Sequence, residues 1–151
     1  MKKKYLLKSF EELLNNELYE ILKLRNEVFI VEQNCIYQDI DDKDEHSLHL
    51  TVWIDGNLAG YTRLLPSGLS YDDISIGRVI TSPKYRGVGL GKELIDKSIG
   101  YCRSRWGNAL IRISAQSYLL KFYESSGFRA IGEEYEEDGI PHIEMIKPPS
   151  D

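Results

Sequence analysis

Three glycines at alternate positions, Gly87, Gly89 and Gly91, form the part of the sequence whose chemistry is most readily predicted. They follow a predicted strand and open a predicted helix. Glycine lets the backbone approach a ligand closely, and the first turn of a helix offers unpaired N–H groups with a positive dipole potential. We therefore expect this loop to bind phosphate, although a tight strand-to-helix turn without a ligand could use the same residues.

The spacing excludes two well-known phosphate loops. A Walker A loop would need glycine where Arg86 stands, and serine or threonine where Glu93 stands. The dinucleotide-binding pattern GxGxxG also fails, because the glycines here are spaced GxGxG. The loop must therefore be of another kind.

The net charge of −5 comes from one segment. Residues 32–45 hold six acids and one base, whereas the other 18 acids and 18 bases cancel. A second acidic run covers residues 133–138, and Lys84, Arg86 and Lys92 form a basic stretch around the glycine loop. Such runs can be solvated loops, but segregated charge can also guide ligands, so we expect an anion at the glycine loop and a cationic partner near residues 32–45. Nucleic acid is not expected, because its binding needs a basic surface.

Four side chains elsewhere are candidates for contact with a substrate. Arg25 lies two helical turns before Glu32, so both would share one side of a helix, where Arg25 either braces Glu32 or holds the next loop beside a substrate. His49 falls in a predicted strand and His142 beside the last predicted turn, and each also has a structural interpretation. No metal site is expected, because His46 and His49 are three apart in a strand pattern and face opposite ways.

The elements that position these residues alternate between strands and helices, which indicates an α/β fold with one domain over residues 1–151. Asp55, Gly56 and Asn57 separate two strand patterns and predict a hairpin. The periodicity predicts strands at 5–7, 48–54, 58–65, 74–81 and 109–115, helices from 9 or 10 to about 33, 89–105 and 118–126, and two last strands around 138–139.

The length of 151 residues is enough to bury a core without disulfides or metals. The longest apolar run, residues 28–31, is far shorter than a membrane span, and no apolar stretch follows Lys2 to Lys4 as in a signal peptide. Cys35 and Cys102 stand alone, which suits a reducing compartment. We therefore expect a cytoplasmic protein with no membrane partner.

Two motifs together resemble a known family. The sequence PKYRGVGLG at residues 83–91 is similar to motif A of the GNAT N-acetyltransferases, and FYESSGF at residues 122–128 resembles their FYxxxGF segment, about thirty residues downstream as in the family. Residues 25–33 and EDGIPHIEM at 137–145 resemble the ElaA-type branch in particular. The likeness covers essentially the whole chain.

The resemblance implies a central, mostly antiparallel mixed sheet with a V-shaped splay between its fourth and fifth strands, flanked by helices. It implies acetyl-CoA as co-substrate, with the pantetheine paired to the backbone of Val79, Ile80 and Thr81. It places the pyrophosphate on the N–H groups of Arg86, Gly87, Val88, Gly89, Leu90, Gly91 and Lys92. Gln116 stands where the family commonly has asparagine, and is the expected substitute contact to the cofactor.

The resemblance also implies direct acetyl transfer to a primary amine in a ternary complex, with Tyr123 as general acid and an N–H near Ile80 as oxyanion donor. We predict Glu32 as the general base, with His49 and His142 as alternatives, and Arg25, His49 and His142 as substrate contacts. The acceptor is expected to be a cationic small molecule or peptide, and the protein a monomer or homodimer. The alternatives are a non-catalytic CoA-binding module and an acyltransferase similar to acyl-homoserine lactone synthases.

Overall fold

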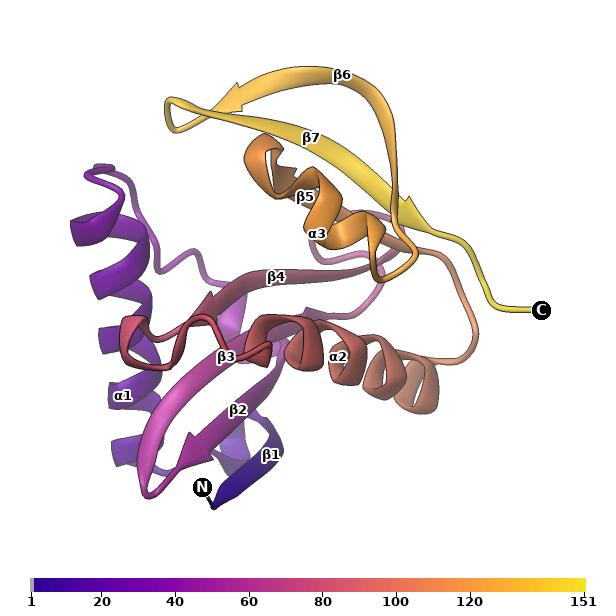
Figure 1. Cartoon of the computed structure of the whole chain (residues 1–151). Helices are drawn as coiled ribbons and strands as arrows, with labels where there is room; N and C mark the ends of the chain where they lie inside the picture. The colour runs from indigo at the N-terminus through magenta and orange to yellow at the C-terminus, as the bar shows by residue number, and fades with distance from the viewer. Residues whose placement is uncertain (1) are drawn as a thin grey trace.

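The computed structural model describes residues 2–151 and contains one seven-stranded sheet in the order β1-β2-β3-β4-β5-β7-β6 (Figure 1). The strands are β1 Lys3–Ser9, β2 Leu48–Ile54, β3 Asn57–Leu65, β4 Ile74–Thr81, β5 Ile111–Gln116, β6 Arg129–Glu137 and β7 Ile140–Lys147. The α-helices are α1 Asn15–Arg25, α2 Leu90–Trp106 and α3 Leu120–Glu124. Shorter helical turns are η1 Phe10–Glu12, η2 Asn26–Glu32, η3 Asp44–His46, η4 Pro83–Tyr85 and η5 Ser117–Leu119.

Every neighbouring pair of strands is antiparallel except β4 and β5. These two pair in parallel only where Ile74 meets Ile111 and Ser75 meets Arg112. Beyond these pairs they diverge toward their C-terminal ends (Figure 1). The mixed, mostly antiparallel sheet and the splay between its fourth and fifth strands are thus confirmed, and within residues 2–151 no strand pairs with the β5 side of residues 77–81.

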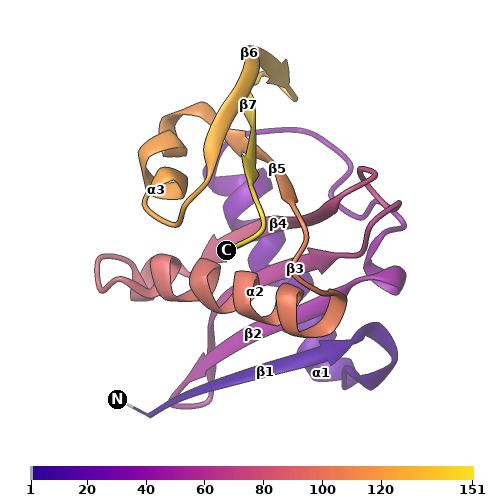
Figure 2. The ribbon, with the colours of Figure 1, turned by 90° about the vertical axis from the view of Figure 1, so that its right-hand side faces the viewer.

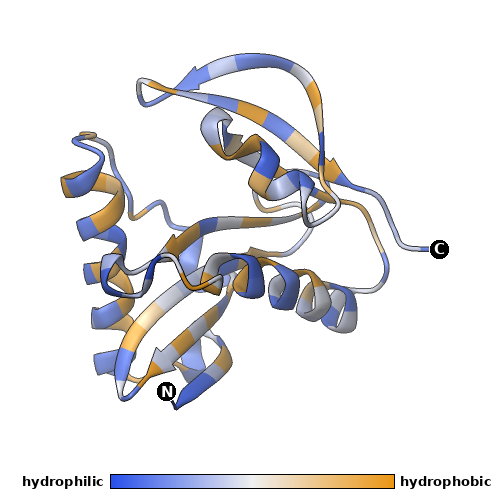
Figure 3. Ribbon diagram, in the orientation of Figure 1, coloured by the Kyte–Doolittle hydropathy of each residue, from blue (hydrophilic) through white to orange (hydrophobic). Residues whose placement is uncertain are grey.

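Different helices cover the two faces of the sheet (Figure 2). α2 packs in the larger core against β3 and β4. On the other face, Ile21, Leu24 and Val28 of the first helical segment pack against Tyr61 and Ile80. Hydrophobic and hydrophilic residues alternate along α1 and α2 (Figure 3), as expected for helices with one face on a sheet.

The predicted hairpin is confirmed. β2 ends at Ile54 and β3 begins at Asn57. The two residues between them, Asp55 and Gly56, have positive φ angles of 50° and 85°. Two successive positive φ angles are what a type I′ turn requires, and this turn matches the twist of the two strands.

The first helix differs from the prediction in its start and in its geometry. It begins at Asn15 rather than near Ser9, because Glu12 accepts a hydrogen bond from the Ser9 N–H at 2.9 Å and closes a separate turn. After Arg25 the chain continues as a π-helix to Glu32. A π-helix is wider than an α-helix, so residues seven apart across it do not keep the same side.

The other predicted elements are found with small shifts in their bounds. The helix predicted at 89–105 is α2, and β5 begins two residues later than predicted. The helix predicted at 118–126 is a 3₁₀ turn followed by the short α3. Within residues 2–151, no helix combines the length and apolar character needed to cross a bilayer.

α2 packs so closely on the sheet at Gly60 of β3 that a substitution there can test this packing. A Cβ atom there would lie 2.6 Å from Leu94 Cδ1 and 3.1 Å from both Ile80 O and Val52 Cγ1. Gly60→Ala is expected to lower the free energy of unfolding by about 1–3 kcal/mol in urea denaturation. Gly100→Ala in α2, where a Cβ meets nothing within 4 Å, is the control and should raise it by roughly 0.5–1 kcal/mol. Unchanged stability of Gly60→Ala would contradict the close packing.

Candidate functional site

A cavity of about 770 Å³ opens between the splayed strands β4 and β5. Its walls come from η2, the loop over residues 33–43, β4, the glycine loop, β5, α3 and the β6–β7 hairpin. Cavities of this size hold small-molecule ligands. The site residues predicted from the sequence that line it are Glu32, Val79, Ile80, Thr81, Arg86, Gly91, Gln116, Tyr123 and His142.

The glycine loop lies at one end of this cavity. Gly87 and Gly89 have φ angles of 85° and 79°, and a Cβ atom at either would meet no atom within 4 Å. Glycine is therefore required here by the left-handed backbone, and the space beside the loop is free for ligand atoms. Gly91 has another role: its Cβ would lie 3.4 Å from the Phe122 ring and 3.5 Å from Thr81 Oγ1, so it lets α2 approach α3.

The side chains of the loop have distinct roles. Leu90 is buried in the main core, whereas Val88 is exposed. Lys92 turns toward α3, where its Nζ lies 3.0 Å from both Asp96 Oδ2 and Ser126 Oγ. Lys92 therefore fixes α2 beside the end of α3. The capacity of the loop to hold an anion lies in its main chain and in Arg86.

Arg86 makes a two-pronged ion pair with Glu32. Its Nη1 and Nη2 each lie 2.7 Å from a carboxylate oxygen of Glu32, and its Nε donates to Thr81 O at 3.2 Å. The hydrogen bonds from Arg86 lower the pKa of Glu32, which makes that carboxylate a weaker base while the pair persists. The predicted brace between Arg25 and Glu32 is wrong, because Glu32 pairs with Arg86 instead.

Tyr123 is 7 % exposed and lines the cavity. Its ring packs edge-on against Phe122 and Phe128, with ring centroids 5.1 Å and 6.0 Å away. Burial raises the pKa of Tyr123, so its phenol stays protonated at neutral pH. A buried, protonated phenol beside the cavity can donate a proton or a hydrogen bond there.

The comparisons with known proteins fit this geometry. The family model of the acetyltransferase (GNAT) domain matches residues 11–148. The chain belongs to the GNAT family. It is 43 % identical over 138 residues to the protein ElaA of Escherichia coli, with 90 % of each chain covered. Membership supports an acyltransferase activity.

Solved structures of GNAT proteins agree with the fold. An acyl-CoA N-acyltransferase from Pseudomonas aeruginosa superposes with a TM-score of 0.92 at 39 % identity, covering 97 % of this chain and 99 % of that one. The crystal structure of Escherichia coli ElaA gives 0.89 at 40 % identity, with the same coverage. A CoA-dependent acyl-homoserine lactone synthase, BjaI, gives 0.81 at 15 % identity over 99 % of this chain and 84 % of that one, which shows a shared fold alone.

Two predicted substrate contacts of this GNAT domain lie away from the cavity. Arg25 is fully buried and His49 is 1 % exposed, and neither lines the cavity. His49 Nδ1 lies 2.5 Å from Tyr61 Oη and its Nε2 lies 2.8 Å from Asp44 O. Burial lowers the pKa of His49, which favours the neutral ring. The prediction that Arg25 and His49 contact the substrate is therefore corrected: both side chains are buried away from the cavity and have a structural role.

His142 and Gln116 do lie at the cavity. His142 is 7 % exposed, and its Nδ1 lies 2.7 Å from Ile140 O. Gln116 exchanges two hydrogen bonds with Gln33, at 3.2 and 3.3 Å. Cys35 Sγ also contacts Asp138 O at 3.2 Å. These contacts join the loop after η2 to β5 and to the β6–β7 hairpin across the cavity.

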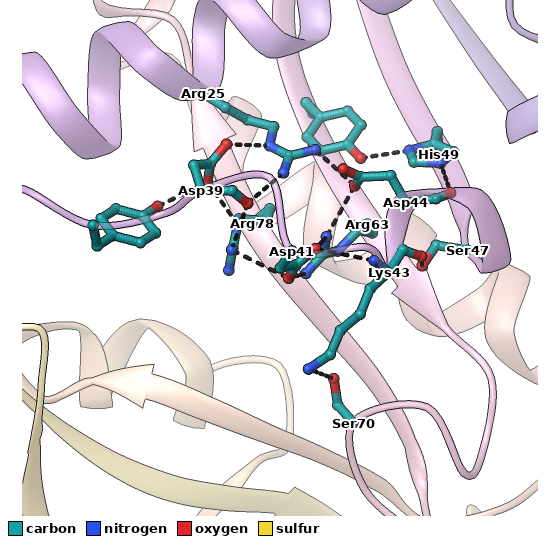
Figure 4. Close-up of polar contacts among 12 residues, drawn as sticks. Arg25, Asp39, Asp41, Lys43, Asp44, Ser47, His49, Arg63, Ser70 and Arg78 are labelled. Atoms are coloured by element: carbon teal, nitrogen blue, oxygen red, sulfur yellow. Dashed lines mark hydrogen bonds and ion pairs between the residues drawn. The ribbon is translucent and has the colours of Figure 1, made fainter.

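A network of arginines and aspartates lies on the α1 side of the cavity (Figure 4), and its members Asp41, Arg63 and Arg78 form part of the cavity wall. Arg25 donates to Asp39 Oδ2 at 2.9 Å and to Asp44 Oδ1 at 2.7 Å. Arg63 of β3 donates to the same Asp44 oxygen at 2.9 Å and to both oxygens of Asp41 at 2.8 Å. The network therefore ties α1, β3 and the segment 39–44 together.

The third arginine of the network, Arg78 of β4, has an unusual backbone. Its φ angle is 49°, at a bulge where β4 shifts register against β3. Its Nε donates to Asp39 Oδ1 at 2.8 Å, and its Nη2 lies 3.3 Å from Asp41 Oδ2. Arg63 and Arg78 were not identified from the sequence. The signal available was three aspartates in one short loop and two arginines in predicted strands, which are residue types that form ion pairs.

The network changes the interpretation of the acidic segment over residues 32–45. Three of its six acids, Asp39, Asp41 and Asp44, are neutralised by arginines. A fourth acid of the segment, Glu32, is paired with Arg86. The segment therefore does not present free negative charge to the cavity, and the expectation of a cationic acceptor loses the observation on which it depended.

Asp41 gives a measurable pH dependence. Burial disfavours its charged form, but the hydrogen bonds and charges of Arg63 and Arg78 outweigh this and lower its pKa from 3.8 to about 2. The folded state therefore gains about 2 kcal/mol above pH 4, and loses it as the pH falls from about 4 to 2. Asp41→Asn should lower the free energy of unfolding by about that much at pH 7 and flatten its fall in acid, as measured in urea at several pH values.

Asp42→Asn is the matched control, because Asp42 is exposed and adjacent. It should leave both the stability and the acid dependence within about 0.5 kcal/mol of the wild type. An acid dependence that Asp41→Asn leaves unchanged would show that the ion pair with Arg63 does not form in solution.

Proposed function

We propose that the protein is an acetyl-CoA-dependent N-acetyltransferase that transfers the acetyl group directly to a primary amine in a ternary complex. The observation that carries this proposal is the junction of three features at one cavity: the unpaired edge of β4, the open glycine loop and the buried phenol of Tyr123. The first two suit the pantetheine and pyrophosphate of acetyl-CoA, and the third can supply the proton that a leaving thiolate needs.

The residues that would hold acetyl-CoA present mainly main-chain groups. Val79, Ile80 and Thr81 line the cavity on the open side of β4, where the pantetheine amides can pair like a strand. The N–H groups of residues 86–92 would hold the pyrophosphate at the start of α2. Gln116 lines the cavity across the splay and would contact the pantetheine once its bonds with Gln33 are exchanged.

In the reaction, the neutral amine attacks the thioester carbonyl carbon, and collapse of the tetrahedral intermediate breaks the carbon–sulfur bond. The bulge at Arg78 leaves Arg78 and Val79 without register partners in β3. An N–H group of this stretch near Ile80 would stabilise the oxyanion. Tyr123 would give its proton to the departing thiolate, and the amine proton passes to a base. No side chain forms a covalent intermediate.

We propose Glu32 as the base, acting directly or through water, and we assign Arg86 the control of its basicity. Arg86 holds Glu32 and Thr81 O at once. Diphosphate oxygens of acetyl-CoA on the adjacent loop compete for the same guanidinium, because Arg pairs well with phosphate. A released Glu32 regains ordinary basicity. His142 is the alternative base, since it also lines the cavity.

We do not propose a cationic acceptor, because the aspartates that suggested one are occupied by Arg25, Arg63 and Arg78. A non-catalytic CoA-binding module would share the loop and the β4 edge, but would have no use for a buried phenol at the cavity. A synthase of acyl-homoserine lactones is supported by the shared fold alone.

Tyr123→Phe separates an enzyme from a binding module. Loss of the proton donor should lower kcat by about 10²–10⁴-fold, while the Kd for CoA stays within about twofold, because the ring and its packing are kept. Turnover is followed by release of free thiol, and binding by calorimetry. Tyr118→Phe, an exposed tyrosine at the same cavity, is the control and should keep full activity. Full activity of Tyr123→Phe would remove it from the mechanism.

Glu32→Gln tests the competition for Arg86. The variant should bind CoA about 1.5- to fivefold more tightly, because a surface ion pair of about 0.2–1 kcal/mol no longer competes with the phosphates. Its kcat should fall by about 10²–10⁴-fold if Glu32 is the base. Glu27→Gln, exposed in the same helical segment, should change neither quantity. Unchanged CoA affinity would refute the competition, and an unchanged kcat would exclude Glu32 as base.

A further inference from the structure

We propose that the acceptor amine carries a carboxylate or a comparable anionic group, and that Lys43 and Arg78 bind this group on the α1-side wall of the cavity. This inference rests on the proposed acetyltransferase function and names the class of its acceptor. It follows from the net positive charge of this wall, from the unused hydrogen-bond donors of Lys43 and Arg78, and from the fixed position of the Arg78 guanidinium.

The wall carries a net positive charge. Of the charged side chains in the network and at Lys43, four line the cavity, Asp41, Lys43, Arg63 and Arg78, and Arg25, Asp39 and Asp44 lie behind them; together they are four cations and three carboxylates (Figure 4). One positive charge is therefore left over. Of the three remaining acids of the segment, Asp42 and Glu45 are exposed and do not line the cavity, and Glu32 is paired with Arg86.

The excess charge is on Lys43. Its Nζ donates to Ser70 Oγ at 2.9 Å, a neutral partner, and within residues 2–151 no carboxylate pairs with it. Both Lys43 and Ser70 line the cavity. Tyr71, whose pKa is raised by burial to about 12, follows Ser70 along the cavity wall and can also donate a hydrogen bond. An anionic group here would meet an ammonium with unused donors and a protonated phenol.

Arg78 supplies a second, fixed cation to the same wall. Its Nε and Nη2 are held by Asp39 and Asp41, and its guanidinium lies 5.7 Å from the centroid of the Tyr37 ring. Within the described chain, its Nη1 has no hydrogen-bond acceptor, and Arg78 lines the cavity. Because its other donors are occupied, the guanidinium is held in place, so little further conformational entropy of this side chain is lost when a ligand binds.

Negative charge lies on a different part of the cavity. Glu137 and Asp138, at the turn of the β6–β7 hairpin, line it together with His142. Glu137 is 52 % exposed at its side chain and has only His142 as an ion-pair partner among residues 2–151. A bound acceptor therefore meets acids on one side and Lys43 on the other. An amine with an anionic group at its far end, such as an amino acid, matches this polarity.

The first experiment compares matched acceptors with acetyl-CoA. Glycine, β-alanine and γ-aminobutyrate are each tested against their carboxamides, and phosphoethanolamine against ethanolamine. At least one amino acid should have a kcat/KM about tenfold or more above its amide. Preference for the phosphate over every carboxylate would identify a phosphorylated acceptor. Equal rates for acids and amides, or a preference for polyamines, would overturn the anionic site.

The second experiment uses variants. Lys43→Met should raise KM for the preferred anionic acceptor about tenfold, with kcat and the rates of neutral amines nearly unchanged. Lys43→Glu should remove the preference for anionic amines altogether. Lys23→Met, an exposed lysine of α1, is the control and should match the wild type. A loss shared equally by charged and neutral acceptors would contradict recognition by Lys43.

A binding measurement distinguishes failure of this inference from failure of the proposed function. The CoA complex is titrated with the N-acetyl derivatives of the three amino acids and of their amides, followed by calorimetry. The acids should bind about tenfold more tightly than the amides, and Lys43→Met should abolish the difference. If no amine is acetylated but this difference is found, the anionic site stands and the transferase proposal falls. Equal binding of acids and amides refutes the site.

Discussion

The position of the cavity wall depends on one buried carboxylate, Asp44, held between two buried arginines. Arg25 has no exposed surface and Arg63 is 3 % exposed, and both donate to the same oxygen of Asp44. Loss of this partner would cost up to about 3–5 kcal/mol, because the buried charge could not return to water and only Asp39 and Asp41 would remain to pair with the two arginines. The chain from residue 39 to residue 44 is therefore fixed against the sheet, and Asp41 and Lys43 are held at the cavity.

The same network stabilises an unfavourable backbone on β4. Arg78 adopts a left-handed φ angle that side chains other than glycine rarely take, and the hydrogen bonds to Asp39 help to offset its cost. The bulge interrupts the pairing of β4 with β3 at the point where β5 has already diverged on the other side. Two interruptions thus expose main-chain groups of one short stretch, Arg78 to Thr81, in the cavity that Tyr123 also lines. The ion pairs and the splay have to be understood as parts of one site.

The fold was predictable from the sequence because its signals are local. The two-residue turn at Asp55 and Gly56, the apolar period of α2 and the glycine loop each depend on neighbouring residues, and the two family motifs gave the splay. The ion pairs were not predictable in the same way. Arg86 and Glu32 are 54 residues apart, and Arg25 and Asp44 are 19 apart, so their pairing depends on tertiary packing. The α-helical period also placed Arg25 and Glu32 together, whereas the intervening π-helix separates them.

The order of the strands leaves β1 and β6 at the two edges of the sheet, and these edges differ in charge. β1 carries Lys3, Lys4 and Lys8, whereas β6 carries four glutamates between residues 133 and 137. Unpaired edge strands invite pairing with other chains, and charged residues oppose it. Two copies that approached through the same edge would therefore bring like charges face to face. The sheet can keep its central splay open for a ligand while each outer edge disfavours pairing with the same edge of another copy.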